Sequence, residues 1–176
     1  MNFYGRRFNI ILSAIAALAL VCGCASDKKK ADKYVSALRL HVESSGNVVS
    51  TGQTITVLRH EPVSVTIGHE PVLTEANLIG AALLETPGGF AVEVKFDETG
   101  SWVLEQHSAA NPGKHFAVFG QWGSKLDEGR WLAAPQISHR IVGGVLAFTP
   151  DCTRDEAKQL VLGLNNAAKK NAERNR

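Results

Sequence analysis

The residues whose types and spacing suggest chemistry are a cysteine, a glycine-containing loop and two His-Glu pairs. Cys152 lies one residue before the start of a predicted helix, where backbone N–H groups and the helix dipole lower the pKa of a thiol. The neighbouring Asp151 opposes thiolate formation and the chain offers no second resolving cysteine, so we interpret Cys152 as a turn residue. Residues 120–125 lack the Gly-x-x-x-x-Gly-Lys-Ser/Thr spacing of a phosphate-binding loop.

The two His-Glu pairs form a small internal repeat that could suggest a metal site. His60-Glu61-Pro62 recurs as His69-Glu70-Pro71 on either side of a predicted strand. Neighbouring residues in an extended segment point in opposite directions, and the pairs lack the His-Glu-x-x-His spacing of a helical zinc site. We interpret both as strand-end turns in which proline blocks further pairing. No Gly-x-Ser-x-Gly motif or distinctive pair of carboxylates is present, so the sequence predicts no catalytic residue, no metal and no cofactor.

A third kind of chemistry, acylation of a thiol, is indicated near the N-terminus. An apolar run from Ile10 to Val21 has the length of a signal-peptide core and is too short to span a bilayer comfortably. It leads into Val21-Cys22-Gly23-Cys24, which resembles a bacterial lipobox, in which the final cysteine is diacylated before cleavage. The sequence therefore predicts that residues 1–23 are a lipoprotein signal peptide and that Cys24 becomes the lipid-bearing N-terminus.

Two other interpretations of this segment stay open: an uncleaved anchor helix, or a soluble secreted protein cut by a general signal peptidase. The length of the apolar run argues against the first, and the Gly-Cys junction argues against the second. Two or three acyl chains make anchoring stable, where a single chain binds only marginally. Because Ala25 and not Asp follows Cys24, resemblance to Gram-negative sorting places the protein in the cell envelope, at the periplasmic face of the outer membrane.

Composition limits the classes of partner. Of the 19 Lys and Arg residues, Arg6 and Arg7 lie in the predicted signal peptide, which leaves 17 against 17 acidic residues. A domain of near-zero net charge lacks the basic surface of a nucleic-acid-binding protein, so we expect no nucleic-acid partner. With Cys22 removed and Cys24 acylated, Cys152 has no partner for an internal disulfide.

The hydrophobic pattern beyond a charged tether at residues 24–35 predicts one α+β domain, a two-layer sandwich of antiparallel or mixed sheet with a C-terminal helix packed on it. We divide it into N-terminal strands at 36–69, a main region at 70–168 and a polar tail at 169–176. Strands are predicted at residues 37–42, 54–58, 63–67, 90–96, 115–119, 131–134 and 141–148. Helices are predicted from Thr74 through Leu83, from Thr99 to Ala109, and after Thr153.

The C-terminal helix carries the clearest local signals. Thr153 and Glu156 have the spacing of a capping box, in which each side chain satisfies an otherwise unpaired backbone N–H. Leu160, Val161 and Leu164 follow on one helical face, so we expect this face to pack against the sheet.

Two tryptophans are candidates for partner contact. Trp122 lies in a polar loop predicted over residues 120–130, and Trp131 ends that loop. Because aromatic residues are enriched among binding anchors, we expect the loop to be the contact surface; the alternative is that Trp122 folds back over a sheet edge or packs beside Trp131.

The order of several motifs between Glu70 and Asn165 resembles the head of the first periplasmic domain of SecD, a subunit of the bacterial protein-export motor. The matching segments are Leu73-Thr74-Glu75-Ala76-Asn77-Leu78, the strand 92–96 with the helix from Gly100 to Leu104, Asn111-Pro112-Gly113-Lys114, Ala134-Pro135-Gln136-Ile137, Arg140-Ile141-Val142-Gly143-Gly144, and Phe148-Thr149 with Glu156-Ala157. The loop at residues 120–130 departs from the family pattern, and the transmembrane helices of SecD have no counterpart here.

The resemblance implies a ferredoxin-like α+β head that binds extended polypeptide and has no catalytic residues. We therefore expect a non-catalytic, lipid-anchored accessory module whose partners are the membrane and exported or envelope proteins. Two alternatives stay open: a structural envelope lipoprotein in a larger assembly, and a periplasmic hydrolase, which would need a deep polar pocket.

Overall fold

The computed structural model describes residues 34–44, 52–58, 61–123 and 126–174, all within a compact unit that begins at Tyr34. The predicted signal peptide, Cys24 and most of the tether lie outside the described residues. Within the described ranges, no helix combines the length and apolar character needed to cross a membrane.

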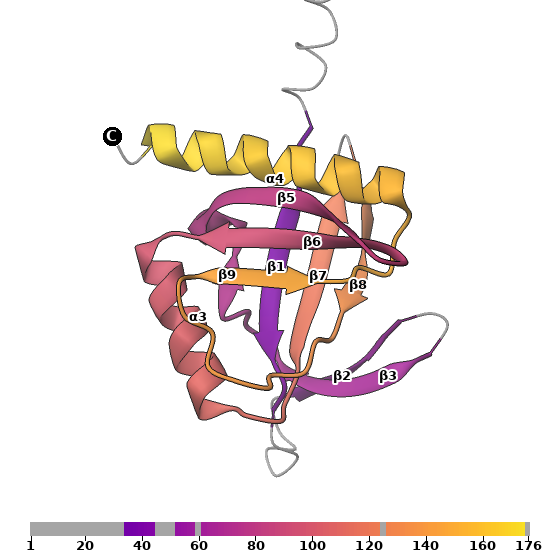
Figure 1. Ribbon diagram of the computed structural model, residues 1–176, viewed down its shortest axis with the longest axis vertical. Coiled ribbons are helices and arrows are strands. Elements are labelled where there is room, and N and C mark those ends of the chain that lie inside the picture. The colour runs from indigo at the N-terminus through magenta and orange to yellow at the C-terminus, as the bar shows by residue number, and fades with distance from the viewer. Residues whose placement is uncertain (1–33, 45–51, 59–60, 124–125, 175–176) are drawn as a thin grey trace, which may run out of the picture. The chain divides into compact units, whose positions relative to one another are not determined.

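Antiparallel strands and two α-helices form the described part of the fold, as Figure 1 shows, and the prediction of an α+β fold is confirmed. The strands are β1 (Ala37–Val42), β2 (Gly52–Val57), β3 (Val63–Gly68), β4 (Leu73–Thr74), β5 (Leu78–Thr86), β6 (Gly89–Phe96), β7 (Phe116–Trp122), β8 (Glu128–Ala133) and β9 (Val145–Phe148). The helices are η1 (Glu75–Asn77, a 3-10 turn), α3 (Glu98–Ala110) and α4 (Arg154–Arg174).

The strands form three antiparallel sheets. One has the order β4-β1-β7-β8, a second consists of β2 and β3, and the third has the order β5-β6-β9. The main core lies between the four-stranded and three-stranded sheets and the helices, and Leu40, Val92, Leu104 and Leu160 are among its fully buried side chains. A smaller core joins the hairpin β2–β3 to the four-stranded sheet.

Helix α4 forms as its sequence predicts and covers one side of the molecule (Figure 1). Glu156 N donates to Thr153 Oγ1 at 3.3 Å and Thr153 N donates to Glu156 Oε2 at 2.6 Å, which confirms the capping box. Leu160 and Leu164 are fully buried, while Val161 is half-buried against the same core. Residues 169–174, predicted as a polar tail, belong to this helix.

The predicted helix from Thr74 through Leu83 is wrong. Thr74 does cap a helical turn, since Ala76 N donates to Thr74 Oγ1, but the turn is only η1 and strand β5 follows it. A continuous apolar run is compatible with a helix or a buried strand, and here the partner strand decides. Pro87 and Gly88 make a two-residue turn with a positive φ at Gly88, which brings β5 back onto β6.

Two other segments also differ from the prediction. Gly120 and Trp122 extend β7, and Glu128 begins β8, so much of the predicted loop is an antiparallel hairpin. The last strand starts at Val145 and not at residue 141, because the chain turns through positive φ at Gly143 and Gly144 before it enters β9.

Candidate functional site: an open strand edge above a groove

Strand β9 is the outermost strand of the three-stranded sheet, and its register shows which backbone groups face outward. Val145 pairs with Lys95 and Ala147 with Glu93, while Phe96 N donates to Gly144 O at 2.9 Å. Hydrogen-bonded and non-hydrogen-bonded pairs alternate in an antiparallel ladder. The N–H and C=O groups of Val145 and Ala147 therefore point away from β6, and no strand among the described residues pairs with them.

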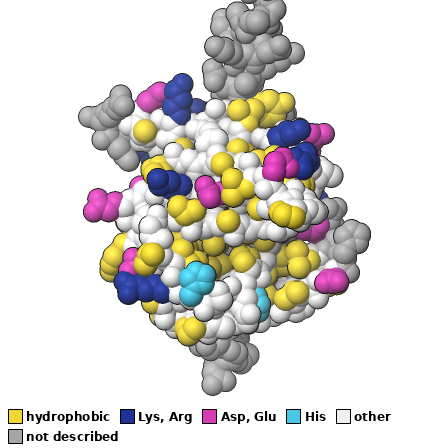
Figure 2. Space-filling model, in the orientation of Figure 1, with side chains coloured by type: hydrophobic (Ala, Val, Ile, Leu, Met, Phe, Trp, Pro, Cys, Tyr) yellow, Lys and Arg dark blue, Asp and Glu magenta, His cyan; other side chains and the backbone are white. Residues whose placement is uncertain are grey.

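A groove of about 220 Å³ runs along this edge. It is lined by Phe116 at the start of β7, by residues 135–139 and Ile141, and by Val145, Leu146 and Ala147 of β9. Figure 2 shows hydrophobic side chains gathered at the centre of the face on which Figure 1 places β9. Small-molecule sites are usually about 300–1,000 Å³, so this groove is of a size for a few side chains.

One wall of the groove is fixed to α3. Ile141 N donates to the buried Ser108 Oγ at 2.8 Å, and the Arg140 guanidinium pairs with Glu105. A β-carbon at Gly144 would lie 3.2 Å from the Cα of Ser101, so only glycine permits this approach. These contacts hold residues 140–144 along the helix, so this segment does not pair with the outer edge of β9.

The opposite wall is fixed to the start of β7 by backbone hydrogen bonds. Phe116 N donates to Pro135 O at 3.0 Å and Ile137 N donates to Lys114 O at 2.7 Å. Ile137 is buried, whereas Gln136 is exposed at the groove. The two walls are therefore preformed by the fold.

The groove is electrically neutral apart from one histidine. None of the lining residues is Asp, Glu, Lys or Arg, and the His139 Nδ1 shares a hydrogen bond of 2.8 Å with Ser138 Oγ. A groove beside outward-facing backbone donors and acceptors is an arrangement by which a sheet edge accepts an extended peptide strand.

The residues with shifted pKa values lie outside this groove, and each shift has a structural cause. Burial, together with the nearby Arg39 charge, lowers the pKa of His41, whose Nδ1 lies 3.0 Å from Gly68 O. A hydrogen bond from Arg154 lowers the pKa of Glu85. Burial opposes ionisation of Glu156, but hydrogen bonds from Thr153 and the Arg130 charge outweigh it and lower its pKa.

Within the described ranges, no three His, Cys, Asp or Glu side chains lie close enough together to hold a metal ion. Cys152 is half-buried and packs against the main core.

The structure separates the two tryptophans that the sequence analysis grouped. Trp122 is fully buried in the main core, with the Arg130 guanidinium 5.1 Å from its ring centroid, so its predicted exposure is wrong. Trp131 is half-buried on the opposite face of the sheet, where its ring packs edge-on against His41 and Phe119. Because β7 extends through Trp122, this residue pairs with Glu128 of β8 and shares a face of the sheet with Glu128 and Arg130. Successive residues of a strand face opposite sides, so Trp131 lies on the other face.

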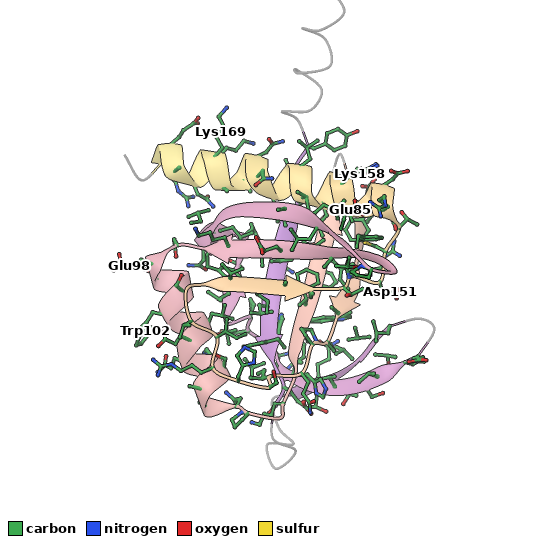
Figure 3. The ribbon with its side chains drawn as sticks, viewed as in Figure 1. Glu85, Glu98, Trp102, Asp151, Lys158 and Lys169 are labelled. Atoms are coloured by element: carbon green, nitrogen blue, oxygen red, sulfur yellow. The ribbon has the colours of Figure 1, made fainter. Side chains whose placement is uncertain are left out.

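The groove itself was not predicted as a site, although a signal was present. Pro135, Gln136, Ile137 and Ile141 of its walls belong to two of the motifs that carry the resemblance to SecD. Sequence analysis also missed Trp102 on α3, which is 64% exposed and points away from the fold in Figure 3. Leu104 and Ser108 are buried on the inner face of α3. Their spacing from Trp102 in a helix places Trp102 on the outer face, and this spacing was the available signal.

Comparison with known proteins agrees with this architecture. A family model described as the P1 head subdomain of SecDF matches residues 47–168, so β2 and β3 belong to the match although the motif resemblance began at Glu70. No curated protein matches the chain.

Two solved structures share the fold. One, reported as the structure and function of a membrane component SecDF that enhances protein export, has a TM-score of 0.53 and 20% identity, over 82% of this chain and 69% of that chain. The other, SecDF in the Super-membrane-facing form, has a TM-score of 0.54 and 21% identity, over 82% of this chain and 21% of that chain. This chain thus spans about a fifth of that SecDF protein. The match of the family model to most of the sequence shows that this chain belongs to the SecDF P1 head subdomain family.

Proposed function

We propose that this protein is a non-catalytic, lipid-anchored module of the cell envelope that binds extended segments of exported or envelope polypeptides. Membership in the SecDF P1 head family relates the chain to protein translocation. The observation that carries the proposal is the edge of β9, which no strand among the described residues pairs with, above a preformed groove lined by both polar and apolar side chains. An extended polypeptide that pairs with this edge places alternate side chains toward the groove.

The length of β9 sets the expected strength of binding. Only Val145 and Ala147 direct backbone groups outward, so a guest strand forms about four backbone hydrogen bonds, each contributing about 0.5–1.5 kcal/mol net. The conformational entropy that a flexible peptide loses on binding reduces this gain in binding free energy. We therefore expect weak and rapidly reversible capture of unfolded segments, with little dependence on their sequence.

A matched pair of substitutions at Ala147 tests the site. Ala147→Pro removes the outward N–H and leaves the hydrogen bonds between β9 and β6 in place, because that N–H does not face β6. Ala147→Val keeps the N–H and adds a strand-favouring side chain. With a fluorescently labelled, unfolded model polypeptide as probe, we expect Ala147→Pro to weaken binding about tenfold or more and Ala147→Val to retain it. Equal affinity of both variants would exclude the β9 edge.

The lipid anchor is tested separately. The intact mass of protein extracted from membranes should show loss of residues 1–23 and the addition of acyl mass at Cys24, as the Val21-Cys22-Gly23-Cys24 junction predicts. An unmodified soluble form in wild-type cells would contradict the anchor without affecting the groove.

A further inference from the structure

A further cavity lies at the start of the described chain, along the C-terminal half of α4. It measures about 280 Å³, and its lining includes Tyr34, Val35, Glu75, Lys170 and Arg174. Figure 1 shows the segment that leads into β1 passing beside α4. We define the entry face as the surface formed by Tyr34, Val35, Lys169, Lys170 and Arg174.

Polar side chains hold the C-terminal half of α4 against the start of the described chain and against η1. Asn166 Nδ2 donates to Tyr34 O at 3.0 Å, and Asn171 Nδ2 donates to Glu75 O at 3.0 Å. A β-carbon at Gly163 would lie 2.7 Å from Ser36 N, so α4 and the start of β1 are in close contact. The cationic end of the helix is therefore fixed beside the point where the chain enters the domain.

Charge is distributed unevenly along α4. The first turns hold two positive residues, Arg154 and Lys158, and two negative ones, Asp155 and Glu156. In residues 169–174 three cations accompany a single acidic residue, Glu173.

The cations and their neighbours suit a phospholipid surface. Lys170 and Arg174 lie four residues apart, on one face of the helix, and both line the cavity. Lys169 points away from the sheets in Figure 3. Glu75 also lines the cavity, but its Oε2 accepts a hydrogen bond from Leu38 N at 3.1 Å, so it is held at the inner side. Tyr34 and the 38% exposed Val35 add an aromatic and an apolar side chain, as membrane interfaces favour.

Covalent geometry brings this face close to a membrane if Cys24 is acylated. Tyr34 lies ten positions after Cys24, and an extended chain spans at most about 3.6 Å per position, which gives roughly 36 Å. A domain tethered so closely meets the bilayer at a high effective concentration, so a weak electrostatic contact is enough to orient it.

We propose that the entry face docks on the headgroups of anionic phospholipids and orients the domain on the membrane. This inference rests on the proposed lipid anchor and is independent of polypeptide binding in the groove. Juxtamembrane Lys and Arg residues typically strengthen association with anionic membranes about fivefold per residue. Docking through the entry face leaves the β9 edge on a different part of the domain, accessible to a polypeptide.

Amine footprinting of the full-length protein, purified from membranes, tests the proposal with native lysines. The protein is mixed with excess vesicles of phosphatidylcholine, alone or with one third phosphatidylglycerol, treated with a water-soluble acylating reagent and read by peptide mass spectrometry. We expect labelling of Lys169 and Lys170 to fall several-fold on anionic vesicles only and to recover in high salt. Lys158, exposed at the other end of the same helix, serves as the internal control.

A matched pair of arginine variants sharpens the test. Arg174→Gln removes one cation of the entry face without adding an amine, and we expect Lys170 labelling on anionic vesicles to rise by up to about fivefold. Arg154→Gln, at the opposite end of α4, should leave Lys170 labelling unchanged. Equal labelling of Lys170 on both vesicle types, or equal protection on both, would overturn docking by charge.

Two other measurements on the same samples test the lipid anchor and the binding of polypeptide in the groove. Intact mass reports acylation, and binding of the labelled polypeptide reports the groove. If acyl mass is absent, the excess of vesicles still allows the footprint to form, so failure of the anchor and failure of the entry face are distinguishable.

Discussion

The two edges of the three-stranded sheet have opposite surroundings. At the β5 edge, the Asn165 side chain of α4 donates to Ala81 O and accepts from Ala81 N, both at 2.9 Å, as a neighbouring strand would. At the β9 edge, the outward groups of Ala147 meet no strand among the described residues. Exposed edges promote unwanted pairing, and proteins usually cover them. The fold covers one edge of this sheet with a helix and leaves the other above a groove, which supports β9 as the edge kept for a guest.

The largest expected effect comes from weakening the packing of α4, the helix that covers the β5 edge. Leu160 is fully buried in the main core, so Leu160→Ala should lower the free energy of unfolding by about 2–5 kcal/mol. Chemical denaturation measures this change, and binding of polypeptide at β9 should persist under conditions where the variant stays folded. An unchanged denaturation midpoint would show that α4 does not stabilise the sheet.

The next effect isolates the Asn165 contacts from the rest of the helix. Asn165→Leu removes both hydrogen bonds to Ala81 and should cost about 1–2 kcal/mol, because each bond contributes about 0.5–1.5 kcal/mol and Asn165 is exposed. Gln159→Leu makes a similar change at another exposed position of α4 and serves as the control. If the two variants unfold at the same denaturant concentration, the covering of β5 does not depend on this side chain.

A proline at each edge compares the two directly. Ala81 and Ala147 both direct their N–H groups out of the same sheet, and among the described residues the N–H of Ala81 has a side-chain partner whereas that of Ala147 has no partner strand. Both substitutions share the restriction of φ and the loss of unfolded-state entropy. We expect Ala81→Pro to be less stable than Ala147→Pro by about 1 kcal/mol in denaturation. The reverse order would mean that the β9 edge is structurally engaged.

The smallest effect concerns the ion pair at the end of β5. Arg154 Nη2 lies 2.9 Å from Glu85 Oε2, and this hydrogen bond lowers the pKa of Glu85. The pair therefore stabilises the fold at pH values above the ordinary pKa of a glutamate. This stabilisation is lost as the pH falls through the lowered pKa. Both groups are exposed to solvent, and such pairs contribute little. Arg154→Gln should therefore leave stability at pH 7 nearly unchanged and slightly reduce its dependence on pH below about 4.5. A large loss at pH 7 would show that this pair helps to hold α4 on β5.

Local signals in the sequence determined several elements without help from the rest of the chain. Thr153 and Glu156 cap α4 by their spacing, alternation marks β1 and β6, and Asn111-Pro112-Gly113-Lys114 separates α3 from the segment before β7. These elements depend on interactions within a few residues, and the order of short motifs was enough to indicate the family.

Tertiary structure decided the features whose partners are distant in the sequence. Residues 78–86 form a strand because β6 and α4 pack against them. Trp122 is buried because β7 continues into a hairpin with β8, whose Arg130 side chain lies over the Trp122 ring. The groove joins residues 116, 135–141 and 145–147, and the entry face joins Tyr34 to a helix end more than 130 residues later. A sequence pattern reports periodicity along the chain, whereas an open edge or a cavity depends on which segment lies beside which.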